Sequence, residues 1–128
     1  MNLLLDTHAV LWFLTGSSSL STRANQYIED GSNAVWVSPA SFWEIAIKIS
    51  LGKYRLDEPL ADFMKREMAQ NAFSVLNITY EHADRVARLP FHHRDPFDRL
   101  MVAQALEENL YLVSADSALD AYGVRRLW

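Results

Sequence analysis

Four carboxylate side chains occupy positions from which they could act together. Asp6 and Asp116 each follow a short apolar segment that is expected to be a strand. Glu44 and Asp98 lie in segments that are expected to be helices. Carboxylates held in one pocket repel each other, and a bound divalent cation removes that conflict. Because oxygen ligands without thiolates favour hard cations, this set predicts a Mg²⁺ or Mn²⁺ site of the kind that assists phosphoryl chemistry.

Each of these acids also has a purely structural explanation. Asp6 and Asp116 could cap the helices that follow them, and Asp98 stands in a first helical turn, where the dipole favours negative charge. Glu44 precedes Lys48 by four residues, which is the spacing of a surface ion pair. However, apolar residues flank Glu44, and a buried glutamate needs a partner. Two acids at strand ends and two on core-facing helices favour one shared site over four separate structural roles.

The elements expected to carry these acids alternate between strands and helices. Strands are expected over residues 2–5, 34–37, 73–78, 110–113 and 124–127, and helices over residues 8–14, 21–31, 38–51, 59–71, 79–89, 95–108 and 117–122. The strands are short and apolar without a period of two, which indicates a parallel sheet covered on both faces. We therefore expect one three-layer α/β/α domain over residues 1–128. Ligands of such sheets bind beyond the carboxyl ends of the strands, where Asp6 and Asp116 fall.

The composition limits the possible functions. The chain has 128 residues with 12 basic and 16 acidic side chains, so bulk positive charge cannot attract nucleic acid. The longest apolar run is Ala9–Leu14, which is too short to span a membrane, and the N-terminus does not resemble a secretory signal. The chain has no cysteine, which excludes thiolate chemistry and fits a cytoplasmic location. The four histidines lack metal-ligand spacing, so we expect a structural or substrate-contact role for them at most.

Other proteins with an acidic α/β site fit less well. A phosphate-accepting receiver domain needs an aspartate at the end of its third strand and a lysine near its last, and residues 77–79 and 126–128 supply neither. An aspartyl phosphatase needs a second aspartate where His8 stands. The four glycines are scattered and form no phosphate loop. A non-catalytic module that binds a partner through its helices remains the alternative to an enzyme.

Four stretches of the chain together resemble the PIN-domain nucleases, and in particular the VapC-like toxins of bacterial toxin–antitoxin pairs. They are Leu4–His8, Ser41–Lys48, His93–Leu100 and Ser114–Asp116. The resemblance covers the whole chain, and Asp95-Pro96-Phe97-Asp98-Arg99 is its most specific part. It implies a Rossmann-like sheet topology and a Mg²⁺- or Mn²⁺-dependent ribonuclease. The acids expected to be both catalytic and metal-ligating are Asp6, Glu44, Asp98 and Asp116.

The resemblance also implies roles for other groups and for partners. Glu44 would ligate a metal or position the attacking water. Ser114 fills the Ser or Thr position of the family two residues before the last acid, and Arg94 and Arg99 flank Asp98, so these three are expected substrate contacts. The expected partners are an RNA substrate, a second copy of the chain in a homodimer and a small antitoxin whose C-terminal segment covers the active groove. No membrane partner is expected.

Overall fold

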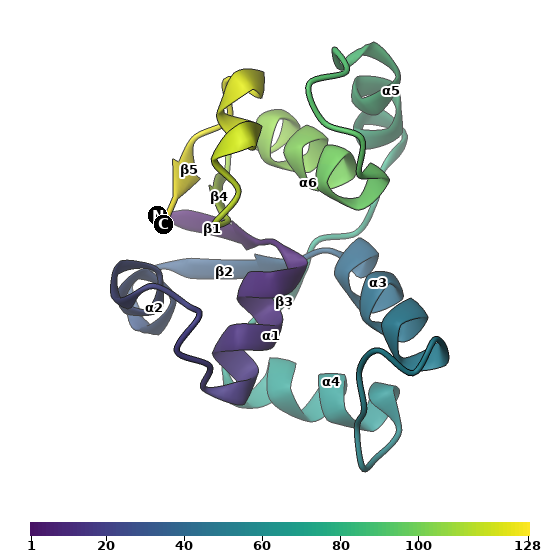
Figure 1. Cartoon of the computed structure of the whole chain (residues 1–128). Coiled ribbons are helices and arrows are strands. Elements are labelled where there is room, and N and C mark those ends of the chain that lie inside the picture. The colour runs from purple at the N-terminus through teal and green to yellow at the C-terminus, as the bar shows by residue number, and fades with distance from the viewer.

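A single parallel sheet organises the molecule. The structure, a computed structural model, describes residues 1–128. The strands are β1 (Asn2–Leu5), β2 (Ala34–Val37), β3 (Ser74–Val75), β4 (Tyr111–Val113) and β5 (Arg126–Leu127), all paired in parallel in the order β3-β2-β1-β4-β5. The helices are α1 (Thr7–Thr15), α2 (Thr22–Glu29), α3 (Pro39–Ser50), α4 (Leu60–Gln70), α5 (Tyr80–Arg88), α6 (Pro96–Glu107) and the 3₁₀ helix η1 (Ser117–Tyr122). Helices lie on both sides of the sheet, which confirms the three-layer α/β/α fold (Figure 1).

The two edge strands are shorter than the sequence predicts. The expected strand over residues 73–78 is regular only at Ser74 and Val75, which pair with Trp36 and Val37. One further backbone hydrogen bond joins the amide of Leu76 to the carbonyl of Val37 at 2.9 Å, and the chain then leaves the sheet edge. The expected strand over 124–127 is likewise reduced to the two residues of β5.

The helices that carry Glu44 and Asp98 begin at strong local signals. The Ser38 side chain accepts a hydrogen bond from the amide of Ala40, and Pro39 opens α3 with a preset backbone angle. The same pattern starts α6, where the Asp95 carboxylate accepts hydrogen bonds from the amides of Phe97 and Asp98. Both starts agree with the sequence prediction. No helix of the structure is at once long enough and apolar enough to cross a membrane.

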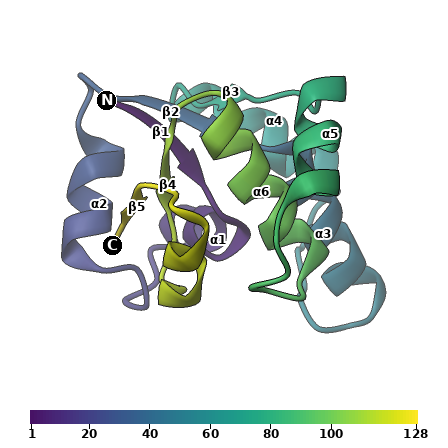
Figure 2. The ribbon, with the colours of Figure 1, turned by 90° about the horizontal axis from the view of Figure 1, so that it is seen from above.

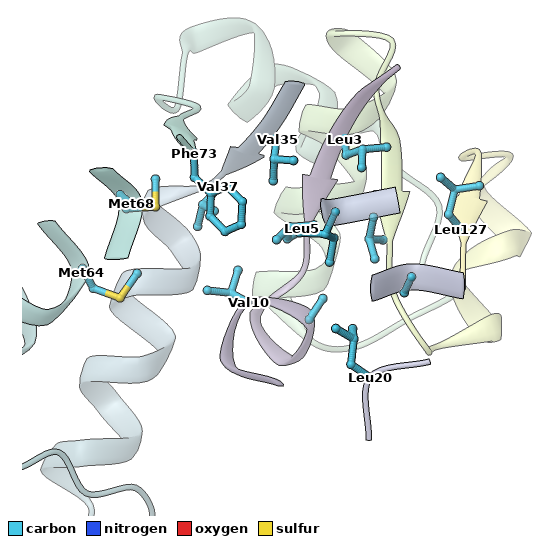
Figure 3. Packing of buried hydrophobic residues seen from close by; sticks show 14 residues of the cluster. Leu3, Leu5, Val10, Leu20, Val35, Val37, Met64, Met68, Phe73 and Leu127 are labelled. Carbon is cyan, nitrogen blue, oxygen red and sulfur yellow. The ribbon is translucent and has the colours of Figure 1, made fainter. Parts of the chain in front are cut away.

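Alternate residues of β1 build the two halves of the core. Leu3 and Leu5 point to the face covered by α1, α2 and α4, where they lie beside Val35 and Val37 of β2 (Figure 3). Leu4 points to the opposite face and packs against α6 and η1. All three leucines are fully buried. Because both faces of the central strand are covered, the position of its carboxyl end is firmly fixed.

The carboxyl ends of the strands meet the first turns of several helices. β1 runs directly into α1 through Asp6, and β2 runs into α3 through Ser38. The β1 and β2 arrows point toward α3 in Figure 1, and Figure 2 shows α6 lying across β1 with α5 beside it. Helix α3 contacts both α1 and α6. One edge of the sheet therefore gathers the segments that carry all four predicted acids.

Candidate metal centre

Asp6 is the most deeply placed acid of the site. Its side chain is buried and caps α1 by accepting a 2.8 Å hydrogen bond from the amide of Ala9. Burial raises the pKa of Asp6 above its ordinary value, and the charge of Glu44 adds to that rise. Hydrogen bonds from Ser114 and Ala9 and the charge of His8 oppose the rise. The cap proposed as the structural explanation is therefore real, and it coexists with electrostatic coupling to a second acid.

Asp98 carries the clearest electrostatic signature of the site. Burial is the largest cause of its raised pKa of about 7, followed by the negative charges of Asp95 and Asp6. Glu44 contributes in the same direction, and His93 opposes it. Asp6, Glu44 and Asp98 thus repel one another at the same sheet edge. A divalent cation would relieve this repulsion, and the all-oxygen donor set fits Mg²⁺ or Mn²⁺.

Asp116 joins the group from the other side of Asp98. One ligand atom each from Asp98, Asp116 and His93 lie within 4.8 Å of one another. The Oδ1 atom of Asp116 accepts a 3.0 Å hydrogen bond from the amide of Ala118, so this acid also caps η1. The four acids predicted from the sequence therefore lie in one neighbourhood. Asp98 lies between two groups: Asp6 with Glu44 on one side, and the more exposed Asp116 on the other.

Ser114 contacts both the buried Asp6 and the more exposed Asp116. It is fully buried, and its hydroxyl accepts a 3.1 Å hydrogen bond from the amide of Asp116. A hydrogen bond from the same side chain acts on the carboxylate of Asp6. These contacts give Ser114 a role in positioning two acids, and its burial leaves little of it for a direct substrate contact.

The two arginines beside Asp98 differ in their surroundings. Arg94 is exposed in the loop before α6, where a phosphate could reach it. Arg99 is only 5% exposed, and its guanidinium donates to the carbonyls of Pro90, Val86 and Leu89. These contacts correct the expectation that Arg99 contacts phosphates. Its hydrogen-bonding capacity is used to hold the segment before α6, because buried guanidinium N–H groups need partners.

His93 is the group that sequence reasoning missed. Its Nε2 atom lies 2.8 Å from Oδ2 of Asp116 and 3.7 Å from Oδ2 of Asp98. The prediction that the histidines lack metal-ligand spacing considered only their spacing from one another. The available signal was the position of His93 two residues before the Asp95 cap, which places its loop at the same sheet edge as Asp98.

Sequence comparisons identify the family of the chain. The family model described as "PIN domain" matches residues 3–124. Ribonuclease VapC22 of Mycobacterium tuberculosis is 30% identical over 120 residues, which cover 93% of this chain and 90% of that protein. Ribonuclease VapC16 of the same organism is 38% identical over 61 residues, which cover 48% of this chain and 42% of that protein.

Solved structures share the fold at low sequence identity. VapBC2 from Rickettsia felis, solved with a DNA fragment from the promoter, matches with a TM-score of 0.74 and 12% identity over 99% of this chain and 98% of that chain. FitAcB from Neisseria gonorrhoeae matches with a TM-score of 0.67 and 17% identity over 98% of this chain and 96% of that chain. Family model, relatives and fold agree, and the chain therefore belongs to the PIN-domain family and is related to the VapC ribonucleases.

Proposed function

We propose that this protein is a Mg²⁺- or Mn²⁺-dependent endoribonuclease and the toxin of a bacterial toxin–antitoxin pair. The observation that carries the proposal is the gathering of acids at one sheet edge, where ligand atoms of Asp98, Asp116 and His93 lie within 4.8 Å of one another. Burial, followed by neighbouring negative charges that include Asp6 and Glu44, raises the pKa of Asp98, in agreement with this crowding. Repulsion between neighbouring carboxylates destabilises the folded protein unless a bound cation or a proton offsets it. The names of the related VapC ribonucleases supply the substrate class.

The residues that would hold the cation are the four acids Asp6, Glu44, Asp98 and Asp116. A bound Mg²⁺ or Mn²⁺ would make water a better nucleophile and would offset the charge that develops on the scissile phosphate. Glu44 is half-buried on α3, and we assign it to metal ligation or to orienting the attacking water. Ser114 holds Asp6 and Asp116 in place, and the exposed Arg94 provides a contact for a neighbouring phosphate.

The protein partners form part of the same proposal. One structure that shares the fold is described as a toxin–antitoxin complex from Klebsiella pneumoniae. We infer that this chain also binds a small antitoxin, forms a homodimer and acts on RNA in the cytoplasm. A basic side chain of the antitoxin would be attracted to the acid cluster and would block it.

Growth of a bacterial host tests the proposal. Expression of the wild-type chain should arrest growth, whereas Asp98→Asn, which keeps the size of the side chain and removes its charge, should not. Sequencing of RNA 5′ ends should reveal new cleavage sites only with the wild-type chain. An Arg66→Gln variant provides the control, because Arg66 pairs at the surface with Glu58, which is not one of the four acids. Growth arrest that persists with Asp98→Asn, without new RNA ends, would favour the non-catalytic interaction module.

A further inference from the structure

We propose that His93 is a positioning residue that orients Asp116 for cation binding by donating its Nε2–H to Oδ2 of that carboxylate. The contact is 2.8 Å long and joins the loop before α6 to the segment after β4. This inference rests on the proposed metal-dependent function, and it adds a residue that the four-acid set does not contain.

A backbone hydrogen bond determines which nitrogen of His93 carries the proton. The amide of Asp95 donates a 3.1 Å hydrogen bond to Nδ1, so the lone pair of Nδ1 is occupied and this atom acts as an acceptor. The ring proton therefore resides on Nε2, which faces the carboxylates of Asp116 and Asp98. A protonated ring nitrogen cannot ligate a metal, so the geometry makes His93 a donor to a ligand and excludes it as a ligand in this arrangement.

The surrounding residues hold the His93 backbone in place. The amide of His93 donates a 3.0 Å hydrogen bond to the hydroxyl of Tyr122, which also accepts from Nη1 of Arg99 at 3.0 Å. The same Arg99 atom donates to the carbonyl of Pro90 at 2.8 Å. The buried arginine and the tyrosine thus fix the loop at Pro90 and at His93 itself. Such support is expected for a group whose direction matters.

Asp116 is restrained by packing less than its neighbour Asp98 is. Its side chain is 41% exposed, compared with 23% for Asp98. The amide of Ala118 holds its Oδ1 atom, and His93 holds its Oδ2 atom. Each carboxylate oxygen has a second lone pair, which stays available for a cation. Hydrogen-bonded partners of metal ligands typically contribute about 10–100-fold to metal affinity.

Calorimetric titration of Mn²⁺ into the purified protein, without RNA, tests this role. His93→Leu replaces the donor ring by an apolar side chain of similar bulk, so we expect the dissociation constant for Mn²⁺ to rise about 10–100-fold. His93→Gln places an amide N–H the same number of bonds from Cβ as Nε2, so it should recover much of the affinity. Arg66→Gln is the control, because Arg66 pairs with Glu58 at the surface and contacts neither His93 nor its supporting residues; its affinity should equal that of the wild type.

The titrations separate failure of this inference from failure of the proposed function. If the wild-type protein binds no Mn²⁺, or if Asp98→Asn binds it equally well, the metal site itself is wrong. If Asp98 is required and His93→Leu binds Mn²⁺ as tightly as the wild type or more tightly, the metal site stands and the positioning role is overturned.

A spectroscopic measurement keeps the inference testable even if His93→Leu does not fold. Long-range ¹H–¹⁵N NMR spectra of the wild-type protein, labelled at the histidine ring nitrogens, report which nitrogen carries the proton. His93 should show a protonated Nε2 and an unprotonated Nδ1, both before and after addition of the diamagnetic ion Mg²⁺. An unprotonated Nε2 in the Mg²⁺-loaded protein would overturn the donor role.

Discussion

The hydroxyl of Thr7 donates a 3.1 Å hydrogen bond to the hydroxyl of Ser41, and both side chains are buried. Thr7 directly follows Asp6 in α1, and Ser41 precedes Glu44 by three residues in α3. The Ser41 hydroxyl in turn lies 3.5 Å from the sulfur of Met101 on α6. The first turn of α1, which Asp6 caps, is therefore joined directly to the first turn of α3, the helix that carries Glu44.

Replacing Thr7 by valine should loosen this junction. The change keeps the shape of the side chain but leaves the buried Ser41 hydroxyl without its donor, which should lower the free energy of unfolding by about 1–3 kcal/mol. Thr15→Val is the matched control, because Thr15 is an exposed threonine at the other end of α1, bonded only to the carbonyl of Leu11. Urea denaturation measures both variants. Equal effects in the two would contradict a special role for the Thr7–Ser41 contact.

Asp98 should make the stability of the metal-free protein depend on pH. Burial, Asp95 and Asp6 raise its pKa from 3.8 to about 7, so the folded protein holds this proton more tightly than the unfolded chain. The stabilising contribution is therefore complete below the unfolded pKa and is lost as the pH rises through about 7. We expect the free energy of unfolding, measured in chelator, to fall over this range more steeply for the wild type than for Asp98→Asn. Parallel curves would argue against the raised pKa.

Mn²⁺ should stabilise the fold as well as serve the reaction. A ligand that binds only the native state raises the melting temperature by mass action, and here it also neutralises carboxylates that repel each other. Asp6→Ala should remove most of this shift, because Asp6 is the most buried acid of the set. Differential scanning fluorimetry with millimolar Mn²⁺ and with chelator measures the effect. A wild-type melting curve that responds to neither would indicate a metal-free module.

The two arginines near Asp98 should respond differently to conservative replacement. Arg99→Lys loses part of the buried hydrogen-bond set to Pro90, Leu89 and Tyr122, and should lower the free energy of unfolding by about 1–3 kcal/mol. Arg94→Lys changes an exposed side chain and should stay within about 0.5 kcal/mol of the wild type. Arg94→Ala should weaken RNA binding without changing stability. A stable Arg99→Lys protein with weakened RNA binding would restore the phosphate-contact role of Arg99.

The positions of the acids were predictable because local signals decide them. Asp6 follows three fully buried leucines of β1, and the starts of α3 and α6 are fixed by a capping side chain and a proline within two residues. Such short-range chemistry can be read from a sequence, and it places Glu44 and Asp98 in their helices. Parallel strands then bring the elements to one edge.

Contacts between distant segments were not predictable in this way. The burial of Arg99 depends on the chain from Val86 to Pro90 folding back over it and on Tyr122, which is 23 residues away in the sequence. The contact of His93 with Asp116 likewise joins residues 23 apart. Strand β3 pairs with only two of the four residues of β2, and the amide of the preceding Phe73 donates instead to the carbonyl of Met68 in α4.

Cleavage of RNA by the purified protein tests the central claim most directly. The measurement compares the initial cleavage rate of a single-stranded RNA by the wild type with Mn²⁺, by the wild type with chelator, and by Asp98→Asn with Mn²⁺. The account predicts cleavage in the first reaction only, with the other two slower by at least about 100-fold, since even the loss of a partner to a metal ligand commonly costs 10–100-fold. Cleavage by Asp98→Asn or in chelator at the wild-type rate would contradict a carboxylate-bound cation as the centre of this enzyme.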